Sequence, residues 1–501
     1  MRPQLKCRPV ATAIMTDRVL PVVTAAALFA SGIPTSWSDE AALQASLATR
    51  NRFGDLGILS TNNFDTGTSN GFFASLGRNG RTCASCHVHD QAETLTPHHA
   101  RRVAAATPHD PLFAPVDGSD CPPLTPDQVA DARHSSLLLR FGVIRVQLAV
   151  PVGADFSLAG ATNPQNCTIA PGDAAIRNEL FLFRRPLPTS NLSFLSSVMW
   201  DGRETHHQIN TGLSLTSMEA LVSNLASQAD AATLGHAQGA RSINASKAQA
   251  DILAFERNLF TAQLRLGNVD LTPSNGGPAY LAQSVAPAFF IGQNDPLGND
   301  FTSTVFTLYQ SWEPDQVPPA RGIKAAIGRG ERIFNTKTFT IANVAGLNSA
   351  SGDPLYNPSD PLANTPITGT CGTCHNTINV GNHSTSLPIN IGATMAVPTD
   401  NNGKPIDHIL DTAHLPVYTL VGSGGTTVRV TDPGRALISG RWFDIGKTKG
   451  PNLRGLAARA PYFHNGSAKD LRTVLDFYNA RFNIGLTAKE IADLVVFLAA
   501  L

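Results

Sequence analysis

Apolar residues near the C-terminal end of the chain recur at the spacing of a helix. Within 487–501 they lie three or four positions apart and so share one helical face. These residues are Ile491, Leu494, Val495 and Leu498. Thr487 precedes the run, and Glu490 follows Thr487 by three residues, which is the arrangement of a capping box. The pattern predicts a terminal helix that begins after Thr487.

Two further segments have helical patterns. Ser467 and Asp470 form a candidate capping box in front of an apolar face. That face consists of Leu471, Val474, Leu475 and Tyr478. The segment 249–264 also places its apolar residues near one face, namely Ile252, Leu253, Phe255, Leu259 and Phe260. We expect the helix at 249–264 to be the last element of an N-terminal domain.

Strand patterns are few by comparison. Only 426–433 and 139–150 have the β-branched residues and alternation of a strand, so the pattern predicts a mainly α fold with long loops. Residues between 264 and 320 are rich in Gly, Pro, Ser and Asn, which is typical of a linker. The expected division is a signal peptide at 1–38, an N-terminal domain at 39–265, interdomain loops at 266–320 and a C-terminal domain at 321–501.

The first residues of the chain have the pattern of an export signal. Arg2, Lys6, Arg8 and Arg18 precede the apolar run 19–30, which is too short to span a bilayer but fits the core of a signal peptide. A buried N-terminal helix is the alternative. We therefore expect an exported, periplasmic protein with no membrane span in the mature chain.

Charge and composition narrow the class of partner. The chain has 501 residues, of which 38 are basic and 38 acidic, so its charge does not favour nucleic acid or an anionic membrane. Its length exceeds the size at which one core keeps growing, and 42% apolar residues are ordinary for a globular protein. Cys7 leaves with the signal peptide. A disulfide between Cys121 and Cys167 is expected in an oxidising compartment, and two separate thiols are the alternative.

The other four cysteines lie in two copies of Cys-x-x-Cys-His, at 83–87 and 371–375. This run is the attachment signature of c-type haem, in which two thiols add to the vinyl groups and the histidine ligates the iron. The two copies lie too far apart for a zinc ribbon, and a thioredoxin-like pair explains neither the duplication nor the histidine. We expect two covalently bound haem c groups, held by Cys83, Cys86, His87, Cys371, Cys374 and His375.

The order of motifs resembles the di-haem cytochrome c peroxidase superfamily, which includes the MauG-type enzymes. After the first haem motif come MWDGRE at 199–204 and ILAFERNLF at 252–260. After the second come NLRGLAARAPYFHNGS at 452–467 and the terminal helix. The resemblance implies two cytochrome c-like haem domains packed face to face. Extra loops near 100–180 and 340–440 make this chain longer.

The resemblance also implies a division of labour between the two haems. The haem on His87 reacts with hydrogen peroxide, the haem on His375 relays electrons, and Trp200 lies between them. A buried core anchor is the alternative for Trp200.

The sixth ligand of the second haem is expected to be Tyr478. Peroxidases of this superfamily commonly place a methionine seventeen residues after the proline of Pro-Tyr-Phe-His, and MauG-type proteins place a tyrosine there. Pro461 is that proline here, and Tyr478 stands at the ligand position. A phenolate favours ferric and higher oxidation states, whereas methionine raises the potential. The alternatives are Met395 as the ligand and a packing role for Tyr478.

Cleavage of peroxide needs a group above the first iron that moves a proton between the two oxygens. The superfamily uses a glutamate about twenty residues after the tryptophan, which one alignment matches to Glu219. A second alignment places His236 or Gln238 over the iron, and we keep Glu219 and His236 as equal candidates. His206 and His207 are lesser candidates, and a surface position is the alternative for all of them.

Calcium between the two domains is typical of the family and remains open here. Its asparagine ligand lies fifteen residues before the tryptophan, and this chain has Arg185 at that position. A cation cannot coordinate calcium and is expected to replace it.

The expected function is that of a periplasmic di-haem oxidoreductase that reacts with hydrogen peroxide. Its other partner is a small electron-transfer protein, or a protein substrate that it oxidises as MauG-type enzymes do. One alternative is a non-catalytic electron-transfer cytochrome, in which His98 or His99 caps the first haem. An oxygenase acting on an organic substrate is a third reading.

Overall fold

The computed structural model describes residues 45–62, 65–116, 130–162, 164, 179–205, 218–313 and 322–501, of which those after Ala41 belong to one compact unit. Several predictions fall outside these ranges: the signal peptide at 1–38 and the pairing of Cys121 with Cys167. His206 and His207 also lie outside them, and the backbone but not the side chain of Glu219 is described. The division into two haem domains stays a prediction.

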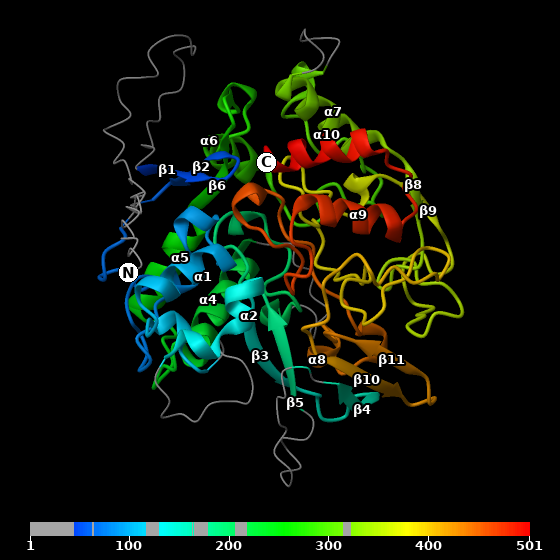
Figure 1. The fold of residues 1–501 in the computed structure, drawn as a ribbon, viewed down its shortest axis with the longest axis horizontal. Coiled ribbons are helices and arrows are strands. Elements are labelled where there is room, and N and C mark those ends of the chain that lie inside the picture. Colours follow the sequence, from blue (N-terminus) through cyan, green and yellow to red (C-terminus); the bar gives the residue numbers. More distant parts are fainter. Residues whose placement is uncertain are drawn as a thin grey trace, which may run out of the picture. The chain divides into compact units, whose positions relative to one another are not determined.

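The prediction of a mainly α fold is wrong. Helices make up 32% of the described structure and strands 17%. The strands form one sheet of four, one of three and two pairs (Figure 1). The sequence hid them because several are buried on both faces and so lack the alternation of a half-exposed strand.

The largest sheet contains β1 (Ala45–Asn51), β2 (Gly54–Ser60), β6 (Leu259–Leu266) and β7 (Val269–Asp270), in that order and antiparallel throughout. β6 corrects the helix predicted over 249–264. Helix α5 (Lys247–Arg257) ends there, and the Asn258 side chain donates to the carbonyl of Ala254 in its last turn. The first five residues of β6 are all buried, so the sequence read as an unbroken apolar helix.

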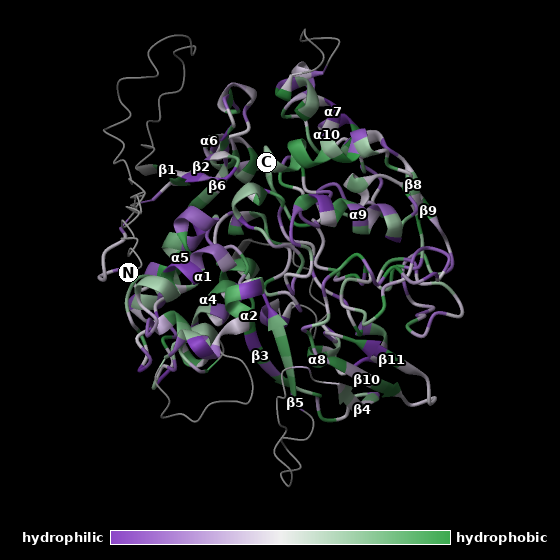
Figure 2. Cartoon of the chain, in the orientation of Figure 1, coloured by the Kyte–Doolittle hydropathy of each residue, from purple (hydrophilic) through white to green (hydrophobic). Residues whose placement is uncertain are grey.

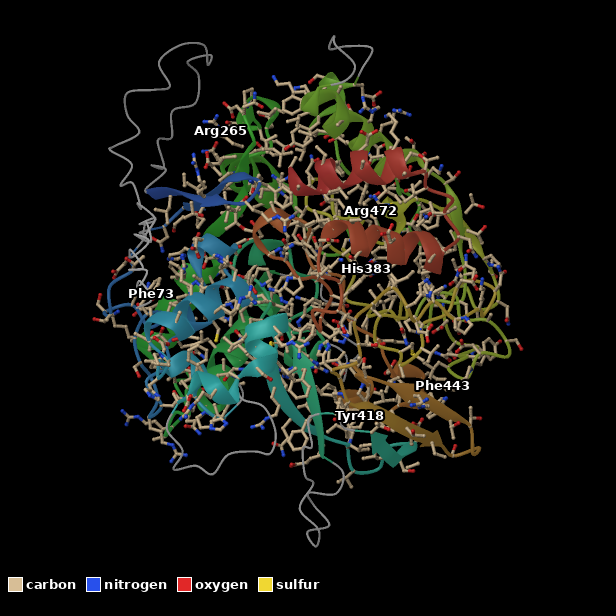
Figure 3. The ribbon with its side chains drawn as sticks, viewed as in Figure 1. Phe73, Arg265, His383, Tyr418, Phe443 and Arg472 are labelled. Carbon is tan, nitrogen blue, oxygen red and sulfur yellow. The ribbon has the colours of Figure 1, made fainter. Side chains whose placement is uncertain are left out.

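Two long insertions form the other strands. β3 (Ile144–Ala149) pairs with β5 (Glu179–Arg184), and β4 (Phe156–Thr162) pairs with β10 (Val417–Gly422), which pairs with β11 (Thr427–Val430). The strand predicted at 426–433 is confirmed by β11, whereas that predicted at 139–150 is confirmed only from Ile144, because 139–141 belong to a helix, Ser136–Phe141. Tyr418 of β10, labelled in Figure 3, donates its hydroxyl to the carbonyl of Phe181 at 2.8 Å and so ties the two insertions together. β8 (Phe339–Ile341) and β9 (Ile367–Gly369) form the last pair.

The C-terminal helices follow the predicted pattern with one change. Helix α10 (Ala488–Ala499) starts after Thr487 and has the predicted capping box. Helix α9 (Leu471–Arg481) is capped by Asp470, which accepts from the backbone of Thr473, so Ser467 is not its N-cap. α10 and helix α7 (Ile323–Thr336) lie so close together that a side chain at Gly330 would not fit: a Cβ there would lie 2.3 Å from the carbonyl oxygen of Asp493. Figure 2 shows the apolar character of α10.

The remaining α-helices gather mainly on the N-terminal side of the chain. They are α1 (Pro97–Ala106), α2 (Ser136–Phe141), α4 (Met218–Gly235), α6 (Pro278–Tyr280) and α8 (Ala436–Ser439). α4 packs against α5, and both lie beside the first Cys-x-x-Cys-His segment (Figure 1). Within the described ranges, no helix combines the length and the apolar character needed to cross a lipid bilayer.

Candidate functional site

Each Cys-x-x-Cys-His motif opens into its own cavity. The C-terminal cavity, defined by Cys371, Cys374 and His375, has a volume of about 220 Å³ and lies against α9 and α10. Its wall is mostly aliphatic and aromatic, which is typical of a cofactor site. The 3₁₀ turn Cys371–Thr373 starts the motif, and the Thr370 side chain caps it by accepting from the backbone of Gly372. This turn brings both thiols to the cavity.

His375 presents one ring nitrogen to the cavity. Its Nδ1 lies 2.7 Å from the carbonyl oxygen of Gly381, and a carbonyl only accepts, so Nδ1 carries the proton and Nε2 keeps a free lone pair. Burial lowers the pKa of His375 to about 4, so the ring is neutral. A neutral imidazole with its other nitrogen fixed by a carbonyl is the arrangement of an iron-ligating histidine.

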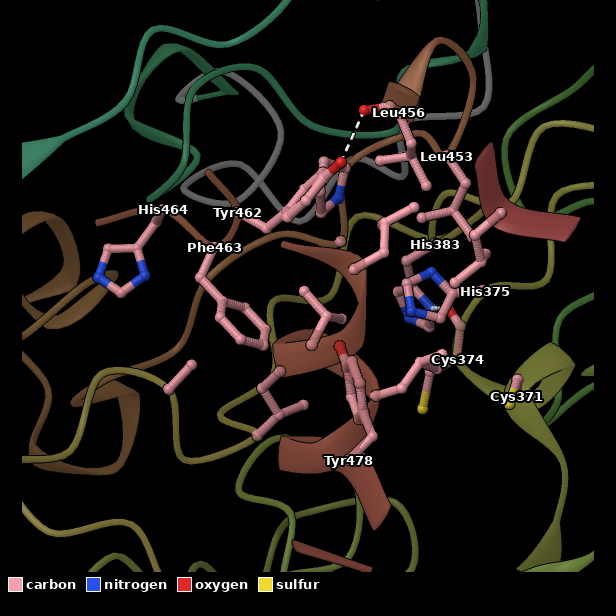
Figure 4. Close-up of a pocket in the computed structure, with 18 of the residues that line it drawn as sticks. Cys371, Cys374, His375, His383, Leu453, Leu456, Tyr462, Phe463, His464 and Tyr478 are labelled. Carbon is pink, nitrogen blue, oxygen red and sulfur yellow. Dashed lines mark hydrogen bonds between the residues drawn. The ribbon is translucent and has the colours of Figure 1, made fainter. Parts of the chain in front are cut away.

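Tyr478 of α9 faces the same space as His375 (Figure 4). The two ring centroids lie 6.4 Å apart and the rings are nearly perpendicular. Burial raises the pKa of Tyr478 above its ordinary value, so without a nearby cation the group is a neutral phenol. Met395 lies elsewhere: it packs against the strand cluster around β10, and the Asn390 amide donates to its sulfur at 3.4 Å. The geometry favours Tyr478 over Met395.

The N-terminal cavity, defined by Cys83, Cys86 and His87, has a volume of about 160 Å³. His87 Nδ1 donates to the carbonyl oxygen of Glu93 at 3.1 Å, and the backbone of Leu187 makes a second hydrogen bond to the ring. Burial, together with the smaller effect of His236, lowers the pKa of His87 to about 4. Both motif histidines are therefore neutral and have Nδ1 fixed by a backbone carbonyl.

His236 is the predicted distal residue that the structure brings to this cavity. It follows the last turn of α4, and its carbonyl accepts from the Asn79 amide at 2.7 Å. Gln238 does not line the cavity. His98 is exposed, and His99 lies beside Arg102 and Asp90, so neither of them caps His87 in this structure.

Glu256 is a cavity residue that the sequence reasoning missed. It is 3% exposed, lines the N-terminal cavity, and its Oε2 has no hydrogen-bond partner. Burial first, and then the nearby charge of Glu93, raises the pKa of Glu256 to about 8. Its sequence position offered a signal, because Glu256 lies four residues after Ile252 on the apolar face of α5.

Trp200 belongs to the wall that the two cavities share. Its indole Nε1 donates to the carbonyl of Arg185 at 2.8 Å, and its own carbonyl accepts from the backbone of Lys449 at 2.9 Å. The ring of His464 lies 6.2 Å from the indole in an edge-to-face arrangement. The structure thus brings the predicted bridge residue to both cavities. Lys449, a second residue of this wall, was missed.

Arg185 is buried in the same wall. Its guanidinium donates to the carbonyl oxygens of Arg459 and Leu95, groups that are far apart in the sequence. A cation therefore already occupies the space between these carbonyls. Among the described residues, no group of three or more His, Cys, Asp or Glu side chains is arranged to hold a metal ion.

The residues of both cavities fit a haem. Each cavity combines a mostly apolar wall, a neutral histidine whose Nδ1 is fixed by a backbone carbonyl, and two thiols. Burial raises the pKa of Cys371 to about 12 and that of Cys374 to about 11, so these are neutral thiols and not metal-binding thiolates. Calcium has no comparable donor set around Arg185.

Comparison with known proteins finds one short sequence match and two similar solved structures. No family model matches the chain. Over 69 residues it is 41% identical to the cytochrome-c peroxidase IdrP1 of Denitromonas iodatirespirans, which is 12% of this chain and 18% of that protein. The chain therefore matches less than a fifth of the length of this relative.

Two solved structures are similar over most of the chain. A MauG-like protein associated with microbial copper homeostasis is 14% identical with a TM-score of 0.31, and the alignment covers 85% of each chain. A variant of the diheme peroxidase BthA from Burkholderia thailandensis is 16% identical with a TM-score of 0.26, over 86% of this chain and 83% of that one. Both TM-scores are below 0.5.

Each of the two cavities has the residues of a c-type haem site, and the relative matched over 69 residues is a cytochrome-c peroxidase.

Proposed function

We propose that the protein is a periplasmic di-haem c-type oxidoreductase that reduces hydrogen peroxide in its N-terminal cavity. The observation that carries the proposal is the pair of cavities, each with its own Cys-x-x-Cys-His motif, on either side of Trp200. Reduction of peroxide takes up two electrons and two protons and yields two water molecules. The protein must therefore deliver electrons from outside and protons at the N-terminal cavity.

The motif residues hold the two haems. Cys83 and Cys86 bind one covalently and Cys371 and Cys374 the other, while Nε2 of His87 and of His375 ligates the iron. When bound, each haem supplies an iron that changes oxidation state by single electrons. The carbonyls of Glu93 and Gly381 keep both imidazoles in the ligating tautomer and orientation.

Acid–base chemistry belongs to the N-terminal cavity. His236 lines it and is able to hold and return a proton; Glu219 near the start of α4 is the second candidate for this role. Glu256 supplies a buried carboxyl group in the same wall. Such positioned groups contribute roughly 10²–10⁴-fold to proton-transfer steps.

Electron relay belongs to the C-terminal cavity. Tyr478 faces His375 and would be the residue that binds the iron of a haem held there, where a phenolate would favour the oxidised state. Burial raises the pKa of this phenol, so the phenol is neutral on its own. A ferric ion facing it would stabilise the ionised form, because a nearby positive charge favours a phenolate. Trp200 lies between the cavities as the relay residue. The donor is a small periplasmic electron-transfer protein, or an oxidisable protein substrate in the MauG-like case.

A non-catalytic electron-transfer cytochrome is the second candidate. The observation that favours it is His236, since an imidazole that lines the same cavity as His87 is able to close that haem as a sixth ligand. In that case peroxide has no open iron to reach.

The test begins with export and haem loading of the full chain. We expect a mature protein that lacks the signal peptide, contains two covalent haems by the pyridine haemochrome assay, and reacts with hydrogen peroxide in stopped-flow absorbance. The double variant Cys83→Ala/Cys86→Ala should retain one covalent haem and lose the reaction with peroxide. A wild-type protein without covalent haem would contradict the proposal, and a loaded but unreactive one would favour the electron-transfer cytochrome.

A further inference from the structure

The C-terminal cavity has an unbalanced charge. Among the described residues that line it are four cationic side chains and neither Asp nor Glu. They are Arg185, Lys337, Lys449 and Arg459. Lys337 is partly exposed and pairs with Glu490 at 3.0 Å. The other three, which we call the cation cluster, are at most 8% exposed and form no ion pair within the described structure.

The cation cluster also has unused hydrogen-bond donors. The Lys449 ammonium carries three donors, of which one is matched to the Ser197 carbonyl at 2.8 Å. Arg185 Nε and Arg459 Nε are buried and have no partner. Buried donors are normally satisfied, so these atoms indicate a group that completes the site.

The neighbouring Arg184 shows what a compensated cation looks like in the same region. It binds Asp201 and Asp432 through short ion pairs, and those carboxylates raise its pKa above the ordinary value. Burial instead lowers the pKa of Arg185 to about 9 and that of Lys449 to about 7. Burial of an unpaired charge destabilises a protein, so the cluster needs an anionic ligand.

We propose that the cation cluster binds the carboxylate side chains of the two bound porphyrins. A haem has its vinyl groups on one edge and its two propionate groups on the opposite edge. Figure 4 shows Cys371 and His464 at opposite ends of the C-terminal cavity, and His464 is the end that approaches Trp200. Attachment at Cys371 and Cys374 thus directs the carboxylate edge towards the shared wall.

Two members of the cluster serve both cavities. Arg185 and Lys449 line the N-terminal cavity as well as the C-terminal one. The carboxylate edges of both porphyrins therefore meet at this wall, beside Trp200. The inference rests on the proposed function, which it deepens by naming the residues that orient the cofactors.

Lys449→Met tests the proposal, with Lys447→Met as the matched control. Lys447 is equally buried but pairs with Asp444 at 3.1 Å and lines neither cavity. Loss of a cation beside a porphyrin carboxylate stabilises the ferric state. We expect Lys449→Met to shift the reduction equilibrium of the Tyr478-side haem at least tenfold towards ferric, about 59 mV for one electron. Lys449→Arg should restore most of the shift, and Lys447→Met should leave it within error.

Resonance Raman spectra provide the second readout. The propionate bending modes should move in Lys449→Met and stay in place in Lys447→Met. Unchanged potentials and unchanged propionate modes in a folded, fully loaded Lys449→Met protein would overturn the proposal.

If Lys449→Met does not fold, the crystal structure of the wild-type holoprotein tests the proposal instead. In that structure we expect carboxylate oxygens within hydrogen-bond distance of Lys449 Nζ and of the Arg185 or Arg459 guanidinium. Carboxylates at the outer edges of the cavities would overturn the inference and leave the proposed function intact. Absence of covalent haem would overturn the proposed function itself.

Discussion

The two cavities have the same frame and different walls. In the N-terminal cavity, the Phe72 ring lies 6.3 Å from His87, and Phe255 of α5 packs on Phe72 at 4.6 Å. In the C-terminal cavity, the Phe334 ring lies 6.2 Å from His375, and Phe497 of α10 packs on it at 5.8 Å. Each motif histidine thus lies beside a phenylalanine ring. That ring packs against a second phenylalanine, which comes from α5 in the first case and from α10 in the second.

The walls differ at the next helical position. Glu256 follows Phe255 and lines the N-terminal cavity, whereas Leu498 follows Phe497 and lines the C-terminal cavity. The C-terminal cavity has Tyr478 facing its histidine, and the N-terminal cavity has His236. One frame therefore carries a cavity with a carboxyl and an imidazole group and a cavity with a phenol. The two cavities differ in single wall residues and not in the haem motif.

The largest expected effect concerns the distal group of the N-terminal cavity. If His236 moves the proton, His236→Ala should slow the reaction with peroxide roughly 10²–10⁴-fold, because acid–base assistance has that magnitude. Glu219→Gln should have the same effect if Glu219 holds the role. Stopped-flow absorbance of the two holoproteins decides between them.

His98→Ala is the control for loss of a histidine, because His98 is exposed and lines neither cavity. Wild-type rates in both His236→Ala and Glu219→Gln would remove the proposed distinction between a proton-handling cavity and a relay cavity.

Trp200→Phe should produce the next largest effect. Replacement of the shared-wall indole is expected to slow electron transfer between the haems about tenfold or more, equivalent to a barrier increase of about 1.4 kcal/mol. Peroxide should still bind at the N-terminal cavity, so the first spectral phase stays fast and the second slows. Trp442→Phe is the control, since its indole donates to the Pro354 carbonyl in the strand cluster around β10.

Glu256→Leu makes the N-terminal wall resemble the C-terminal one. The folded-state pKa of Glu256 is raised to about 8, so the neutral carboxyl is favoured by folding. Its contribution to stability is present below the unfolded pKa and is lost as the pH rises towards 8. The wild type should therefore lose up to about 1.4 kcal/mol of unfolding free energy per pH unit in this window.

Urea unfolding of the holoprotein at pH 5, 6, 7 and 8 measures this effect. The slope should flatten in Glu256→Leu and also in Glu256→Gln, which keeps the shape of the side chain. An unchanged slope in both variants would show that Glu256 ionises freely and that the two walls differ less than the geometry indicates.

The motifs that carry chemistry were predictable because they are local. Cys-x-x-Cys-His needs only two thiols and an imidazole on one turn, and Tyr478 follows from the ligand spacing after Pro461 that the family resemblance implies. Both reach the cavities expected of them. The capping box at Thr487 and Glu490 was predictable for the same reason.

What escaped prediction depends on long-range contacts. The strands β6 and β5 are buried on both faces, so no alternation reveals them. Lys449 appears in the sequence as an ordinary surface lysine, and only the fold places it between two cavities and away from carboxylates. Glu256 likewise depends on which partner covers the apolar face of α5.

The most direct test of an open N-terminal haem beside a closed C-terminal one is a stoichiometric peroxide titration of the ferric holoprotein, followed by absorbance and EPR. The account predicts a high-spin ferric signal that disappears quickly with peroxide, together with a second haem whose signal changes in Tyr478→Phe. Two low-spin haems that ignore peroxide, even after one-electron reduction, would contradict it and leave an electron carrier as the better description.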